Sequence, residues 1–247
     1  MYDFGLIIAI ALLIGSFINA VIYRLPRQES LVWPGSHCRA CGHRLPAWDM
    51  IPVISYLWLR GKCRFCRRRI SLRYLLVEII IVFSFGLIYR KWGLTVESGV
   101  GWVLTSILTI CAITDLEEGI IPNCITYPGI LAGLLLSPLT IGIESSIQGA
   151  IFFAGILLMA ALISSGGMGG GDIKLAGVIG AFTGLTGAIL TLFLSALGGS
   201  LWAMLLIWQG KADCKTAIKF GPFLAAAAWL VWLYEWEIFA FLGQMLA

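Results

Sequence analysis

Two aspartates, Asp115 and Asp172, lie where long apolar stretches meet short polar ones, and these positions predict acid–base chemistry. A carboxylate at the edge of a bilayer-length apolar segment is costly to keep, so it indicates a functional role. Asp172 follows a run with five glycines within residues 166–171. Glycines let the backbone approach an extended substrate closely. The residues expected to support the substrate or its loop are Gly169, Gly170, Gly171 and Lys174.

Segment parity predicts that the two aspartates share one membrane boundary. Asp115 closes the third apolar stretch and Asp172 precedes the sixth, so the chain crosses outward and returns between them. Two neighbouring carboxylates can supply one base and one acid, which suits activating water and protonating a leaving amine. The alternative for Asp172 is a helix N-cap, because an interfacial Asp before a helix often has that role.

Four cysteines in the longest polar segment predict a metal site. They form two CxxC pairs separated by 21 residues, and the residues are Cys38, Cys41, Cys63 and Cys66. Four thiolates at such spacing can hold a tetrahedral structural zinc. The alternative is two disulfides, but a basic loop indicates a cytosolic face, where thiols stay reduced. His37 and His43 flank the first pair and are expected to be surface residues, since four cysteines complete the site.

The composition predicts an all-α polytopic membrane protein. The 247 residues are 60% hydrophobic and 12% charged, whereas soluble domains are usually about half apolar and about a quarter charged. Continuous apolar runs indicate helices that span a bilayer. We expect about eight transmembrane helices, at residues 5–23, 75–89, 99–114, 125–142, 147–165, 175–187, 188–208 and 222–242. Gly184–Gly187 is the expected turn between the sixth and seventh.

Charge placement predicts the orientation and the division into domains. Eleven of the 17 basic residues lie between Arg24 and Arg73, and basic loops stay on the cytoplasmic side. The N-terminus is therefore expected outside, and the polar loop inside, the bacterial cytoplasmic membrane. The expected domains are a first helix (1–23), a cytoplasmic tetra-cysteine zinc loop (24–74) and a membrane bundle (75–247). Glu78, just inside the second helix, either snorkels to the boundary or assists the site, and snorkelling is the favoured expectation.

Several blocks, in this order, carry a resemblance to a known family. They are Gly15–Pro26, the two CxxC pairs, Asp49–Tyr56, Ile70–Glu78, Gly169–Lys174 and Phe220–Leu224. Together they closely resemble the type 4 prepilin leader peptidases, which are membrane aspartic peptidases of the GxGD class. Two departures are Leu75, where the family commonly has proline, and Met50, where asparagine is common.

The resemblance implies a function and a set of roles. Asp115 and Asp172 would be the catalytic pair, and the substrates would be prepilins and pseudopilins of type IV pilus or type II secretion systems. Cleavage would occur on the cytoplasmic side, and the new N-terminal amine would then be methylated with S-adenosylmethionine. The tetra-cysteine loop accompanies this bifunctional form, with zinc as a scaffold of the loop.

Two other classes of protein remain as alternatives from the residues alone. An ion-coupled transporter also uses membrane acids and glycine-broken helices, but its charged residues would be expected near the midplane. A membrane-anchored zinc-ribbon binding module would leave Asp172 and its glycines unexplained.

Overall fold

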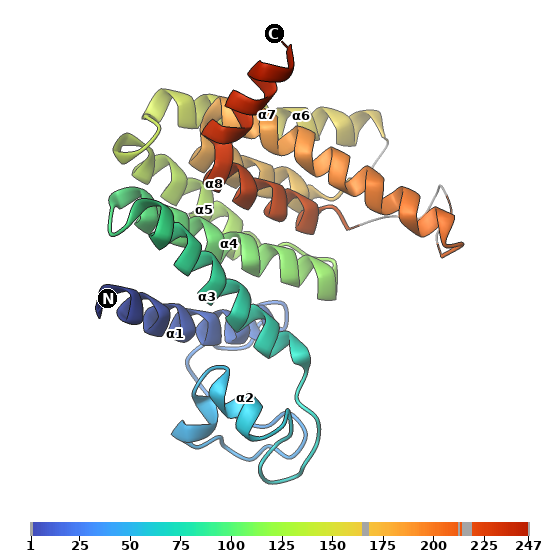
Figure 1. The fold of residues 1–247 in the computed structure, drawn as a ribbon. Helices are drawn as coiled ribbons and strands as arrows, with labels where there is room; N and C mark the ends of the chain where they lie inside the picture. Colours follow the sequence, from blue (N-terminus) through green and yellow to red (C-terminus); the bar gives the residue numbers. More distant parts are fainter. Residues whose placement is uncertain (1, 165–167, 212, 214–218, 247) are drawn as a thin grey trace. The chain divides into compact units, whose positions relative to one another are not determined.

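The computed structural model describes residues 2–164, 168–211, 213 and 219–246, so Gly166 and Gly167 of the glycine run lie outside the described residues. Within these residues the chain is helical, with two isolated β-bridges and no strand. The all-α prediction is therefore confirmed (Figure 1). The elements are α1 (Tyr2–Arg24), η1 (Ala47–Met50), α2 (Ile54–Trp58), α3 (Leu72–Trp92), α4 (Val96–Glu118), α5 (Asn123–Leu136), η2 (Ser137–Leu139), α6 (Ile143–Ile163), α7 (Gly170–Trp208) and α8 (Gly221–Leu246).

The chain divides into two compact units, residues 1–98 and 99–247. In the first unit, α1 and α3 pack side by side and the polar loop connects them (Figure 1). A side chain on Gly15 of α1 would lie 3.1 Å from the Cα atom of Glu78 on α3, so the helices approach closely there. One turn further along α1, the Asn19 side-chain amide donates to the Tyr74 carbonyl at 2.9 Å. This seam explains why α3 belongs with α1 and the loop rather than with the later helices.

Small residues bring α5, α6 and α7 together in the second unit. Gly129 and Gly133 of α5 face Val178 and Ala181 of α7. Only small residues admit such a close approach of two helices.

The contact between α6 and α7 is closer still. A side chain on Gly149 of α6 would collide with the backbone of Gly180 and Gly184, and one on Gly180 would collide with the backbone of Gly149. Ser146 donates across the same contact to the Ala181 carbonyl at 2.6 Å. The two helices therefore meet backbone to backbone.

Helix α7 is interrupted at Gly184, where φ is +69° and ψ is −171°. These angles lie in the left-handed region that glycine tolerates best. The chain reverses here, because both ends of α7 lie near the start of α8. At the beginning of α7, Asp172 is a neighbour of Asp115, which in turn contacts Gly221. In the last third of α7, Gly199 faces Phe220. The expected turn is thus in the right place, but it is a single glycine rather than residues 184–187.

Other helix limits differ from the expectation for identifiable reasons. Helix α5 ends at Leu136, and Pro138 lies in the short 3₁₀ helix η2 rather than kinking a longer helix that reaches residue 142. Proline lacks the N–H that a continuing helix needs, so the chain leaves the α conformation here. Helix α6 begins at Ile143, four residues earlier than expected, and the first arm of α7 begins at Gly170, five residues earlier.

In the described part of the chain, five helices are long and apolar enough to cross a membrane: α1, α3, α4, α6 and α7. Helix α5, with 14 residues, is shorter, at about 21 Å against a hydrocarbon core of about 30 Å. The first arm of α7 is equally short. The protein is therefore a multi-pass membrane protein, and the number of eight spans stays a prediction.

We predict that Gly149→Ala destabilises the second unit by about 1–3 kcal/mol, because the new methyl group must push α6 away from α7. Gly155→Ala in the same helix is the matched control, since nothing lies within 4 Å of the added atom. That control should be neutral or stabilising by up to about 1 kcal/mol, because alanine favours a helix. Thermal unfolding in detergent measures both, and equal midpoints would contradict the contact.

Candidate active site and metal centre

The structure brings Asp115 and Asp172 together from two helices. Asp115 lies in the last turn of α4 and Asp172 is the third residue of α7. Both are buried, with 8% and 9% of their surface exposed. The two carboxylates are near enough for the charge of Asp115 to influence Asp172. The geometry therefore agrees with the segment-parity argument, and the catalytic role of the pair stays a prediction.

The start of α8 closes this site beside Asp115. The backbone N–H of Gly221 donates to the Asp115 carboxylate, and a side chain on Gly221 would lie 2.8 Å from the Asp115 Oδ2 atom. Lys219 donates to the Leu116 carbonyl at 2.8 Å, and its charge acts on Asp115. Neither Lys219 nor Gly221 was among the predicted site residues. The Phe220–Leu224 block was the only sequence signal that could have indicated them.

Asp172 also helps to begin helix α7. Gly169 is the N-cap of α7, and its backbone N–H donates to the Asp172 carboxylate. A carboxylate at the third helical position often reaches back in this way to the N-cap residue. The N-cap alternative is therefore wrong in detail, although Asp172 does help to begin the helix.

Each aspartate keeps one oxygen without a protein partner. Among the described residues, Asp115 Oδ2 and Asp172 Oδ1 are buried and accept no hydrogen bond. Buried polar atoms usually have a partner, because leaving one unsatisfied costs about 1–3 kcal/mol. Two such oxygens on interacting carboxylates can share a proton or hold a reacting water between them. The arrangement is chemically suited to general acid–base catalysis.

The predicted support residues have three different surroundings. A side chain on Gly171 would lie 2.9 Å from the Ile121 side chain, whereas nothing lies within 4 Å of one on Gly170. Lys174 donates to the Asn123 side-chain carbonyl at 2.7 Å and lies 5.5 Å from the centre of the Tyr127 ring. Lys174 therefore connects the start of α7 to the start of α5.

The four predicted metal ligands form one cluster. The Sγ atoms of Cys38, Cys41, Cys63 and Cys66 all lie within 4.8 Å of one another. Cys38 Sγ and Cys66 Sγ are 3.8 Å apart, which is the separation expected of thiolates at about 2.3 Å from one tetrahedral zinc. All four thiols are free rather than paired in disulfides. The donor set and its spacing therefore fit zinc.

The two CxxC pairs form turns with the same backbone pattern. Cys38 N–H donates to the His43 carbonyl at 2.9 Å, and Cys63 N–H donates to the Arg68 carbonyl at 2.9 Å. The residue four positions after each first cysteine is left-handed, with φ of +70° at Gly42 and +58° at Arg67. The loop thus uses one local geometry twice, with glycine at the strained position in only one of the two turns.

Hydrogen bonds shift the pKa values of two of the thiols, Cys38 and Cys41, in opposite directions. Burial opposes ionisation of Cys38, but the backbone N–H groups of Ala40 and Cys41 and the thiols of Cys63 and Cys41 lower its pKa to about 6. At Cys41 a backbone hydrogen bond from His43 works in the opposite direction. Burial and its contacts with Cys38 and Cys66 outweigh that bond and raise the Cys41 pKa to about 11.

The two histidines lie outside the thiol cluster. His37 Nδ1 lies 3.0 Å from the Gly35 carbonyl. The His43 ring packs against the Phe65 ring with 3.6 Å between their centres, so it connects the first turn to the second. Neither belongs to the group of potential ligands found in the described residues.

The fold and sites define a multi-pass membrane protein with a buried acid pair and a four-thiol loop, and comparison with known proteins identifies the family. Residues 9–92 match the Bacterial Peptidase A24 N-terminal domain, and residues 102–204 match the Type IV leader peptidase family. The chain belongs to the type IV leader peptidase family, and it is therefore an enzyme of a peptidase class. The two matches correspond closely to the two structural units.

Several curated relatives are similar over nearly their whole length, and each is named prepilin leader peptidase/N-methyltransferase. The protein from Pseudomonas putida is 34% identical, over 99% of this chain and 95% of its own. The one from Bacillus subtilis (strain 168) is 34% identical, over 99% and 97%. The one from Pseudomonas aeruginosa is 31% identical, over 94% and 90%. No solved structure matches the chain significantly. These relatives give no support to the transporter alternative.

We predict that Gly42→Ala weakens metal retention by the loop, because alanine in the left-handed region costs about 1–2 kcal/mol. No atom lies within 4 Å of the added methyl group, so this strain is the only expected effect. Arg67→Gly, at the equivalent position of the second turn, should retain zinc at least as well as the unmodified protein. Zinc release to a chromogenic chelator compares them, and equal release from both variants would contradict the account of the turns.

Proposed function

We propose that this protein cleaves the leader peptide of type IV prepilins and pseudopilins with Asp115 and Asp172, on the cytoplasmic side of the inner membrane. The observation that carries the proposal is the acid pair itself. Two buried carboxylates from α4 and α7 interact, and each has an oxygen without a protein partner. The names of the relatives supply the substrate class.

The mechanism uses the two carboxylates in complementary states. One of them takes a proton from the attacking water, and the other gives a proton to the leaving amine of the leader peptide. The Gly221 N–H holds the Asp115 carboxylate, and the Gly169 N–H holds that of Asp172. These backbone donors position the acids without side chains that would occupy the site.

The small residues beside the acids fit an extended substrate backbone. Gly169 and Gly170 lead into α7, and Gly170 leaves open space where a side chain would be. Helix α5 and the first arm of α7 both begin beside the site and are short. Asp115 lies in the last turn of the apolar helix α4 and Asp172 in the first turn of α7. The proposal therefore has the acids at a membrane boundary, where water is available for hydrolysis.

We also propose that the protein methylates the new N-terminal amine with S-adenosylmethionine, and that its two units divide the chemistry. The second unit holds the acid pair, so the first unit, with its four-thiol loop, is left for methyl transfer. The amine nitrogen forms the new N–C bond, the C–S bond of the donor breaks with its electrons on sulfur, and the amine proton goes to water. Zinc, held by the four cysteines, would scaffold this unit rather than act in cleavage.

The orientation follows from the charges in the loop. With the N-terminus outside, the basic residues between Arg24 and Arg73 lie in the cytoplasm, where such residues are retained. The same orientation places the end of α4 and the start of α7, and therefore the acid pair, on the cytoplasmic side.

We predict that Asp115→Asn and Asp172→Asn each lower cleavage by at least about a hundredfold, because either change removes an acid–base partner. Glu118→Gln is the matched control, since Glu118 is an exposed acid at the end of the same helix as Asp115. Mass spectrometry of a prepilin incubated with each purified variant measures loss of the leader. Near-normal cleavage by either aspartate variant, in a folded protein, would exclude the two-aspartate site.

Two glycines around the acids should tolerate a side chain poorly. Gly221→Ala places a methyl group 2.8 Å from Asp115 Oδ2, and Gly171→Ala places one 2.9 Å from Ile121. Both should lower cleavage by about tenfold or more, because misplaced catalytic groups are costly. Gly155→Ala, in α6, has nothing within 4 Å of the added atom and is no part of the proposed site, so it should cleave nearly normally. The same prepilin assay ranks the three variants, and a larger loss at Gly155 than at Gly221 would contradict this geometry.

A further inference from the structure

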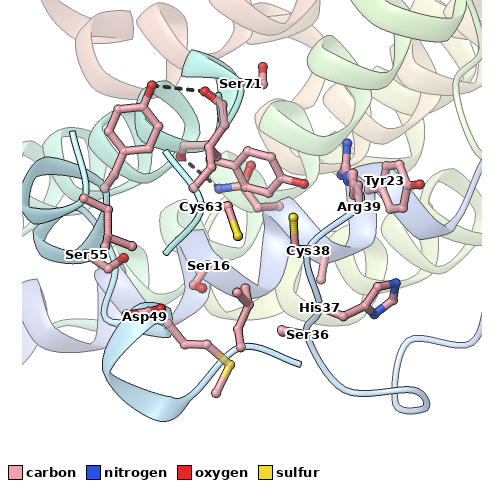
Figure 2. Close-up of a pocket in the computed structure, with 18 of the residues that line it drawn as sticks. Ser16, Tyr23, Ser36, His37, Cys38, Arg39, Asp49, Ser55, Cys63 and Ser71 are labelled. Atoms are coloured by element: carbon pink, nitrogen blue, oxygen red, sulfur yellow. Dashed lines mark hydrogen bonds between the residues drawn. The ribbon is translucent and has the colours of Figure 1, made fainter. Parts of the chain in front are cut away.

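A cavity of about 540 Å³ lies within the first unit and is lined only by residues between Ser16 and Glu78. Its walls come from α1, the polar loop and the first turns of α3. The thiols of Cys38 and Cys63 form part of its lining, so the cavity adjoins the metal centre (Figure 2). Its volume is in the range of about 300–1,000 Å³ that holds small-molecule ligands.

The most buried acid in this lining is Glu78, which is 7% exposed. Glu78 Oε2 accepts a hydrogen bond of 2.7 Å from the Val53 N–H. Val53 holds that N–H in place at a φ of +62°, a conformation that is rare for a β-branched residue. Within the described residues no lysine or arginine pairs with Glu78. The carboxylate is therefore held in position without a positive partner, and it does not snorkel as expected from the sequence.

A second buried acceptor of the lining belongs to Asn19 of α1. Asn19 is 2% exposed, and its amide nitrogen donates to the Tyr74 carbonyl. Its Oδ1 atom is buried and has no hydrogen-bond partner among the described residues. Asn19 lies one turn after Gly15, which packs against Glu78. Two acceptors on the α1–α3 seam thus await a ligand that donates hydrogen bonds and carries positive charge.

Two arginines of the lining, Arg24, which is buried, and Arg39, which is exposed, already have partners. Arg24 donates to the carbonyls of Ser30, Leu31 and Pro34 at 2.7–3.0 Å. The Arg39 guanidinium lies 3.2 Å from the centre of the Tyr23 ring. These cations hold the loop together, so they do not form a phosphate site.

The exposed side of the lining has a different charge. Arg64 forms a bidentate pair with Asp49, which is 9% exposed. Arg68 and Arg69 also line the cavity and are exposed. The buried part of the lining therefore holds Glu78 without a cationic partner and Arg24 bonded to carbonyls, whereas Arg68 and Arg69 lie toward solvent.

We propose that this cavity binds S-adenosylmethionine, with Glu78 against its positively charged sulfonium and ammonium groups. Asn19 Oδ1 then accepts from an ammonium, amino or hydroxyl group, and Arg68 or Arg69 meets the carboxylate. This placement rests on the proposed methyl transfer and assigns it a site. It also explains why the four-thiol loop accompanies the transferase, since Cys38 and Cys63 shape the cavity wall.

The test uses the zinc-loaded, full-length protein in detergent and measures binding rather than turnover. Equilibrium dialysis with tritiated S-adenosylmethionine should give one site per chain. Glu78→Gln should weaken binding by about tenfold or more, because a charge-assisted contact is lost. It should also reduce the preference for S-adenosylmethionine over uncharged-sulfur S-adenosylhomocysteine. Glu29→Gln, at an exposed acid of the same unit, is the matched control and should bind normally.

A second variant and a cross-linking experiment test the site independently, in case Glu78→Gln does not fold. Ser16→Phe fills the cavity from α1 and should abolish binding while prepilin cleavage continues. Ultraviolet cross-linking of the tritiated donor to the unmodified protein should label peptides within residues 16–78. Normal affinity in both variants, or label within residues 99–247, would overturn this site and leave the peptidase assignment intact. A protein that cleaves prepilin but binds no donor would overturn both the site and the methyl transfer.

Discussion

The structure of the second unit depends on holding two like charges close together at the end of apolar helices. Asp115 and Asp172 are each less than a tenth exposed and interact directly. Such a pair is unfavourable unless the backbone supplies donors and one proton is shared. Here the donors are the N–H groups of Gly221 and Gly169, which come from the first residues of two different helices or their caps. The site therefore needs three helix ends to meet at one point.

Close backbone packing is what allows these ends to meet. Helix α7 lies against α6 at Gly149 and Gly180 and then reverses at Gly184. The reversal returns the second arm of α7 toward the start of α8, where Gly199 faces Phe220. Larger residues at these positions would separate the helices and move Gly221 away from Asp115. The glycines far from the acids thus contribute to the chemistry through geometry.

The sequence predicted the parts of this arrangement that follow from composition and periodicity. The length of the apolar stretches predicted the helices. The number of segments between Asp115 and Asp172 predicted that they lie together, and the spacing of the cysteines predicted the four-thiol cluster. It missed Lys219 and Gly221, because their nearness to Asp115 depends on how α8 packs. It also misjudged Glu78, since an acid near a helix end ordinarily reaches solvent. The Val53 N–H that holds it comes from a loop conformation that no local pattern specifies.

The buried acids of the two units have different electrostatic surroundings, and these suit them to different reactions. In the proposed mechanism the acid pair binds a neutral peptide bond and exchanges protons, so each carboxylate is matched by the other. Glu78 has no such neighbour and is fixed by one backbone donor, so its charge remains available to a cation. A buried carboxylate without a positive partner is costly, and a cationic ligand would offset that cost on binding. A pair suited to proton transfer and a single acid suited to a charged methyl donor are thus different sites, and the chain places them in different units.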